Sequence, residues 1–297
     1  MAAADAIHET IPLSHPNAHQ ELTALSTEQQ LSALDRATRR GDRARFDALL
    51  EVMTAELQGD IAQTCRLMKC AGAYGFSYGV DAIFQVQEAG VAAQLAAGPA
   101  GAQLRTHSCS LWSRVFRGLK LAFSGALQNA HIDTVLHIAR YMRGIHEQWP
   151  SMRPRWLLAL GPMRCAVKQG GDVARRMLTW VVDGGMGEIE NALFGANYLS
   201  LPKRKQWRGR PGMGWTLMHE AAGAGDIRAT AYVYERIVEG NTLLLKKRCS
   251  DTECHALMMR MFQGRRWLQG AVASGSADAV CLALGWAAAA GAAAAQG

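Results

Sequence analysis

Small and apolar residues recur along the chain in one fixed register. An apolar anchor is followed by a small residue three positions on, glycine or alanine seven on, and further apolar residues about fourteen on. Residues three, four and seven apart share one helix face, so the anchor and the small residues form a narrow stripe. Glycine seven positions on ends the helix, because it readily accepts the left-handed conformation. The register predicts antiparallel helix pairs without strands, and the first helix of each pair contains one of six anchors: Leu34, Met68, Phe123, Met163, Met218 and Leu268.

The fifth copy of the register is the most specific. The segment Gly214–Asp226 reads GWTLMHEAAGAGD, and it resembles the T-P-L-H-x-A signature of the ankyrin repeat. Leu217 stands where that signature has proline. The positions that match in type and order are Thr216, Met218, His219, Ala221, Ala222 and Gly225.

The resemblance implies a fold and a function. Ankyrin-like helix-turn-helix units stack into a solenoid, and the shorter helices with their preceding loops form a concave surface that binds proteins. On this chain the exposed positions two, five and six after the anchors would form that surface. Four of these residues are cations, which favours an acidic partner. The predicted partner-binding residues are Arg36, Arg39, Arg40, Tyr74, Gln128, Asn129, Lys168 and Gln169.

The spacing between anchors limits how regular the stack can be. Met68 follows Leu34 by 34 residues, close to the ankyrin period of about 33, but later anchors lie 40 to 55 residues apart. We therefore predict an all-α fold, an irregular α-solenoid of ankyrin-like repeats with inserted helices and loops. Residues Ser110–Leu121 read as one added amphipathic helix. The expected segments are a flexible lead over 1–26, repeats over 27–286, and an alanine- and glycine-rich tail over 287–297.

Composition and charge indicate the cellular compartment of the protein. The chain has 297 residues, a net charge of +7 and seven scattered cysteines, which favours reduced thiols in an intracellular compartment. The N-terminus does not read as a signal peptide, and no apolar run reaches membrane-spanning length. We expect a cytoplasmic protein, with the nucleus as the alternative.

A basic segment supports a competing function. The stretch Pro202–Trp215 reads PKRKQWRGRPGMGW and contains no acidic residue. Its Arg-Gly-Arg-Pro portion resembles an AT-hook, whose arginines lie along the minor groove, and its Lys-Arg-Lys portion resembles a nuclear import signal. The alternative interpretations are a nucleic-acid-associated protein and a solvated loop between two repeats. The candidate nucleic-acid-binding residues are Lys203, Arg204, Lys205, Arg208 and Arg210.

Motifs for enzymatic chemistry are weak. The segment Gly75–Gly79 matches the G-x-S-x-G nucleophile elbow, which would make Ser77 the nucleophile of a hydrolase. That motif requires a strand before the serine, whereas the preceding residues read as helix. Cys249 and Cys254 lack the second cysteine pair of a structural zinc site, and no Walker or dinucleotide-binding motif occurs. We expect no catalytic residue, metal or cofactor, and a protein that is not an enzyme.

Overall fold

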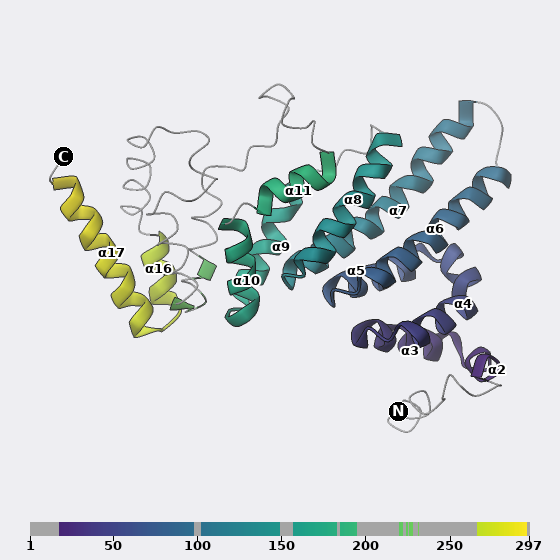
Figure 1. Ribbon diagram of the computed structural model, residues 1–297, viewed down its shortest axis with the longest axis horizontal. Helices are drawn as coiled ribbons and strands as arrows, with labels where there is room; N and C mark the ends of the chain where they lie inside the picture. The colour runs from purple at the N-terminus through teal and green to yellow at the C-terminus, as the bar shows by residue number, and fades with distance from the viewer. Residues whose placement is uncertain are drawn as a thin grey trace. The chain divides into compact units, whose positions relative to one another are not determined.

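The computed structural model describes most of the chain and divides it into two compact units. It describes residues 18–97, 102–148, 157–182, 185–194 and 266–295, together with positions 220, 221, 224, 226, 227 and 231. Throughout these residues every regular element is an α-helix, as Figure 1 shows. Unit 1 comprises Met1–Ala126 and Asp133–Pro154, and unit 2 comprises Leu127–Ile132 and Arg155–Gly297. The expected all-α class is confirmed.

Unit 1 is built from helix pairs that pack on their neighbours in the sequence. The helix α3 packs on α4 and α5, while α4 and α5 both pack on α6, so first helices contact first helices and second helices contact second helices. The helices are α2 (Ala18–Thr23), α3 (Thr27–Arg40), α4 (Arg43–Gly59), α5 (Ile61–Ala73), α6 (Ser77–Ala97), α7 (Ala102–Gln128) and α8 (Ile132–Gln148). The last two residues of α7 and the first residue of α8 belong to unit 2.

Unit 2 also contains consecutive helices that pack on each other. The helix α9 packs on α10, α10 contacts α11, and α16 packs on α17. The helices are α9 (Leu157–Lys168), α10 (Gly171–Val182), α11 (Gly185–Phe194), α16 (Arg266–Ala273) and α17 (Ala277–Ala295).

The predicted helix stops are confirmed wherever the structure describes them. A residue with positive φ lies seven positions after each of five anchors, and four of the five are glycines. The alanine three positions after each anchor is buried, with at most 2 % of its surface exposed, in all six copies. In the five copies whose stop the structure describes, the register therefore fixes both the end of the first helix and the stripe that it buries. The left-handed residues are Gly41, Gly75, Ala130, Gly170 and Gly275.

Side-chain caps define the helix starts in unit 1. Ser26 and Gln29 form the predicted capping box, in which each side chain bonds the backbone N–H of the other. Asp42 and Asp60 cap α4 and α5 by accepting from backbone N–H groups of the first turn.

Two expected segments have different bounds in the structure. The lead is folded from residue 18 onward, because Leu22 is buried and its carbonyl accepts a hydrogen bond of 2.9 Å from Gln30 Nε2. Ser110–Leu121 is no separate helix but part of the continuous α7. Within the alanine- and glycine-rich tail, residues 287–295 continue the helix α17, in keeping with the high helix propensity of alanine.

Several predictions lie outside the described residues. Residues 1–17, the basic segment 202–215, the fifth anchor Met218 and its stop Gly225 belong to this group. No helix in the described part of the chain has the length and apolarity needed to cross a membrane.

Candidate partner-binding surface

Two predicted binding residues meet in unit 1, on neighbouring first helices. The guanidinium of Arg39 on α3 lies 5.5 Å from the centre of the Tyr74 ring at the end of α5. Arg39 also forms an ion pair with Asp35 at 2.7 Å, and Asp35 Oδ1 accepts from the Cys70 thiol at 2.8 Å. Tyr74 is 47 % exposed and the Arg39 side chain is 52 % exposed. We call these four residues, Asp35, Arg39, Cys70 and Tyr74, the α3–α5 patch.

The charges of the α3–α5 patch stabilise one another. The neighbouring Asp35 carboxylate raises the pKa of Arg39, and this effect outweighs burial. Burial, followed by the bond and charge of Asp35, raises the pKa of the Cys70 thiol to about 12. A thiol with such a pKa stays protonated at neutral pH and is a poor nucleophile. The patch therefore has the chemistry of a recognition surface, with an exposed aromatic ring beside an arginine.

The other two predicted arginines differ in exposure. Arg36 is half-buried and donates a hydrogen bond of 3.1 Å to Ser32 Oγ on its own helix, whereas Arg40 is exposed at the end of α3. Arg40 therefore extends the exposed positive charge beside Arg39, and Arg36 does so only in part.

The predicted residues of unit 2 join neighbouring helix pairs. Gln169 Nε2 donates to the carbonyl oxygen of Gln128 at 2.7 Å, and Asn129 is half-buried beside it in the sequence. Lys168 Nζ lies 3.3 Å from Glu220 Oε2, so its charge is partly compensated within the unit. These side chains are engaged in contacts within the unit, so they are less available to a partner than the exposed side chains of the α3–α5 patch.

Glu220 is the charged centre of this contact in unit 2. It also accepts a hydrogen bond of 2.6 Å from Arg164 Nε, and its side chain is only 9 % exposed. Burial raises the pKa of Glu220, but the hydrogen bonds and charges of Arg164 and Lys168 outweigh burial and lower it overall.

Equivalent register positions make equivalent contacts in the two units. In unit 1, positions one and five after the anchor, Asp35 and Arg39, contact position two of the next pair, Cys70. In unit 2, the same positions, Arg164 and Lys168, contact position two of the next copy, Glu220. One arrangement of neighbouring first helices therefore occurs twice, with different side chains.

A third instance of this arrangement uses small residues instead of charges. In unit 1, a Cβ atom added to Gly125 on α7 would lie 2.8 Å from the carbonyl oxygen of Lys69 and 3.3 Å from Ala73 Cβ on α5. These are again positions one and five of one pair against position two of the next. Small residues here bring the two helix backbones together.

The second helices carry polar contacts that sequence analysis missed. The Tyr78 hydroxyl donates to Asp47 at 2.8 Å, and Arg43 lies 5.0 Å above the Tyr78 ring. Asp81 lies 2.5 Å from His137 Nε2 in the next pair. Both aspartates stand thirteen positions after an anchor, a position that the first two copies share.

Ser77 occupies a structural position. Its hydroxyl lies 3.0 Å from Thr134 Oγ1, and Thr134 also donates to the carbonyl oxygen of Gly75. The element before Ser77 is the helix α5, so the strand that a nucleophile elbow requires is missing and the hydrolase interpretation gains no support. Among the described residues, no group of three His, Cys, Asp or Glu side chains is arranged to hold a metal ion.

Comparison with known proteins identifies no relative of this chain. The chain matches no protein-family model, no curated protein and no solved structure.

Proposed function

We propose that this chain is an ankyrin-like protein-interaction module that binds a protein partner through the exposed ends of its first helices. The observation that carries the proposal is the repeated contact between neighbouring first helices, at the same register positions in both units. Stacked repeats of this kind use the row of side chains along one face to bind other proteins.

The α3–α5 patch is the proposed centre of binding in unit 1. Tyrosine and arginine are, with tryptophan, the residue types enriched among energetically dominant interface residues. Tyr74 and Arg39 combine both types on one exposed surface, and their cation–π contact holds the tyrosine ring in place before a partner arrives.

The charge around the patch favours an acidic partner segment. Arg39, Arg40, Arg66 and Lys69 are exposed on α3 and α5, and α5 contains no acidic residue. Asp35 compensates only part of this positive charge. Complementary charge raises the association rate and selects the partner more than it adds affinity.

The second helices provide a matched control for the test. Arg43 stacks over Tyr78 on α4 and α6 much as Arg39 stacks over Tyr74 on α3 and α5. The test uses the wild type and the double variants R39A/Y74A and R43A/Y78A as baits in affinity capture, and mass spectrometry quantifies the bound proteins. Thermal melts establish that each bait is folded.

The proposal expects a set of partner proteins that R39A/Y74A loses and R43A/Y78A retains. Truncation of a hot-spot arginine or tyrosine weakens binding by about 2 kcal/mol or more, which is roughly thirtyfold. Equal capture by all three baits would place the binding surface elsewhere on the molecule. Equal loss by both variants would mean that binding follows stability and not the patch.

A further inference from the structure

The first helices α5 and α7 carry basic side chains and no acidic ones. Together they contain six Lys or Arg residues and no Asp or Glu. The second helices α4 and α6 contain five Asp or Glu residues and only two Arg. Positive charge is therefore concentrated on α5 and α7.

These two helices lie side by side. A Cβ atom added to Gly118 on α7 would lie 2.6 Å from Met68 Sδ and 3.7 Å from Cys65 Sγ on α5. A Cβ atom on Gly125, two turns further along α7, would lie 2.8 Å from the carbonyl oxygen of Lys69. Because the glycines let the two helices approach closely, the exposed sides of α5 and α7 form one surface.

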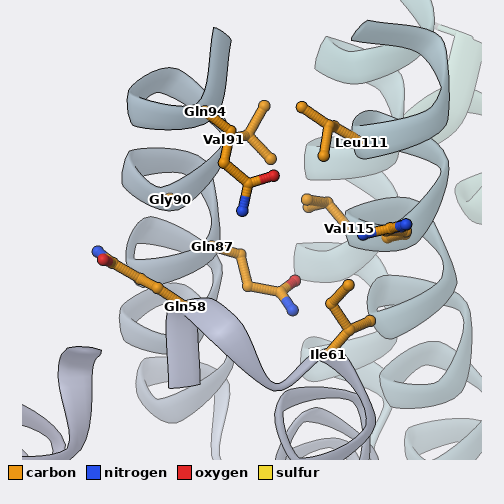
Figure 2. Close-up of a pocket in the computed structure, with 9 residues that line it drawn as sticks. Gln58, Ile61, Gln87, Gly90, Val91, Gln94, Leu111 and Val115 are labelled. Carbon is orange, nitrogen blue, oxygen red and sulfur yellow. The ribbon is translucent and has the colours of Figure 1, made fainter. Parts of the chain in front are cut away.

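The exposed cations of this surface lie on the sides of the helices turned away from α6. Figure 2 shows Leu111 and Val115 of α7 directed toward α6. Arg117 comes two residues after Val115, so it lies about 200° around the helix axis, on the opposite side. The helix α5 also packs on α6, and its exposed residues include Arg66 and Lys69.

Four cations of α5 and α7 are exposed and form no ion pair with any residue that the structure describes. We call them the α5–α7 basic face: Arg66, Lys69, Arg114 and Arg117. Burial raises the pKa of the Cys65 thiol and the charge of Arg117 opposes this effect, which indicates that the α7 arginine is close to α5. Such a cluster of like charges attracts a polyanion.

We propose that the α5–α7 basic face binds the phosphate backbone of a single-stranded nucleic acid, and that a base stacks on Tyr74. Phosphate contacts require positive charge, and arginine, which supplies three of the four cations, binds phosphate bidentately. Within the described part of unit 1, Tyr74 is the single large apolar side chain that is exposed, and it directly follows α5. One exposed aromatic ring suits base stacking better than insertion into a membrane, which needs a broad apolar face. The inference does not depend on protein binding at the α3–α5 patch, although both sites use Tyr74.

The test measures the fluorescence anisotropy of a labelled uridine dodecamer with the full chain at several salt concentrations. The variant Arg66→Gln/Arg117→Gln removes one cation from each helix of the face. The matched control is Arg43→Gln/Arg140→Gln, because it removes the same net charge from exposed positions on the second helices α4 and α8. Tyr74→Leu removes the stacking surface, and thermal melts show whether each variant is folded.

The wild type should bind the dodecamer, and log Kd should rise linearly with the logarithm of the salt concentration. Because each lost phosphate contact lowers that slope by about 0.7, Arg66→Gln/Arg117→Gln should lower it by about 1.4 and raise Kd about tenfold or more at about 100 mM salt. The control should leave both quantities unchanged. Tyr74→Leu should raise Kd about fivefold or more without changing the slope.

The proposal is overturned if the wild type shows no saturable binding at about 50 mM salt. Equal effects of the two double variants overturn it too, since binding would then follow net charge or the basic segment 202–215. An unchanged Kd for Tyr74→Leu contradicts the stacked base. If a glutamate dodecapeptide or phosphatidylserine vesicles displace the labelled dodecamer as well as unlabelled dodecamer does, the face binds an acidic protein or a membrane instead.

Discussion

At the scale of single residues, burial and one neighbouring carboxylate determine the chemistry of Cys70. The thiol donates to Asp35 from the adjacent helix, and burial is the larger of the two effects that raise its pKa to about 12. Cys165 and Cys281 are exposed. Since only the thiolate reacts with alkylating agents, the three cysteines should differ in reactivity.

We therefore predict that iodoacetamide at pH 8 modifies Cys70 at least about tenfold more slowly than Cys165 or Cys281. Asp35→Asn removes the negative charge that opposes ionisation, so it should accelerate the modification of Cys70 and leave the other two rates unchanged. Peptide mass spectrometry over a time course measures all three rates in one sample. A Cys70 rate equal to that of Cys165 would show that the thiol is neither buried nor bonded as described.

At the scale of elements, the close approach of α5 and α7 depends on glycine. A Cβ atom at Gly72 would lie 2.7 Å from Ala122 Cα and would overlap the Ala122 carbonyl. Backbone atoms cannot move aside as a flexible side chain can. The pair of helices therefore tolerates no side chain at this position without a shift of the backbone.

Gly72→Ala should lower the free energy of unfolding by about 2 kcal/mol or more, because overpacking forces the two helices apart. Gly144→Ala in α8 is the matched control, since the space around that glycine is open and alanine favours helix by about 1 kcal/mol. Urea melts should move the two midpoints in opposite directions. A Gly72→Ala midpoint at or above that of the wild type would contradict the packing of α5 on α7.

The contact of Glu220 with α9 makes the stability of unit 2 depend on pH. Folding lowers the pKa of Glu220 below its ordinary value of 4.5. The resulting stability is present above that value and is lost as the pH falls through the lower value of the folded state.

Glu220→Gln should therefore destabilise the protein by about 1–2 kcal/mol at pH 7, through loss of its charge-assisted bonds to Arg164 and Lys168. At pH 3 the difference from the wild type should shrink. Glu147→Gln serves as the control, since its exposed pair with Arg143 at 3.6 Å should change stability by less than about 0.5 kcal/mol. Urea midpoints at the two pH values measure the effect, and a loss that is equal at pH 7 and pH 3 would contradict the assigned charge contacts.

At the scale of the whole molecule, the sequence predicts those features that depend on local conformation. Helix stops at glycines, the buried alanine stripe and the Ser26 capping box follow from the properties of single residues or a few neighbours. The contact of Asp35 with Cys70 joins residues 35 positions apart and depends on how two helices stack. The length of α7 and the burial of Gln87 also depend on packing between helices, so the sequence does not predict them. The sequence of α7 reads like that of a shorter helix, and the sequence around Gln87 reads like that of an exposed one.

The central claim is that one register governs every helix pair, including the fifth. In that register Gly223 stands five positions and Gly225 seven positions after Met218, and both glycines lie outside the described residues. Gly170, at position seven of the fourth copy, has a φ of 71° and open space around it, so Gly170→Ala measures the strain of the left-handed conformation alone.

The most direct test is a set of urea melts on Gly223→Ala, Gly225→Ala and Gly170→Ala. The register predicts that Gly225→Ala and Gly170→Ala each destabilise the protein by about 1 kcal/mol, while Gly223→Ala, inside the first helix, stabilises it by about 0.5–1 kcal/mol. Opposite signs two residues apart would place the helix stop at Gly225. A Gly225→Ala midpoint equal to or above that of the wild type, with Gly170→Ala lowered, would contradict the register in the copy that most resembles an ankyrin repeat.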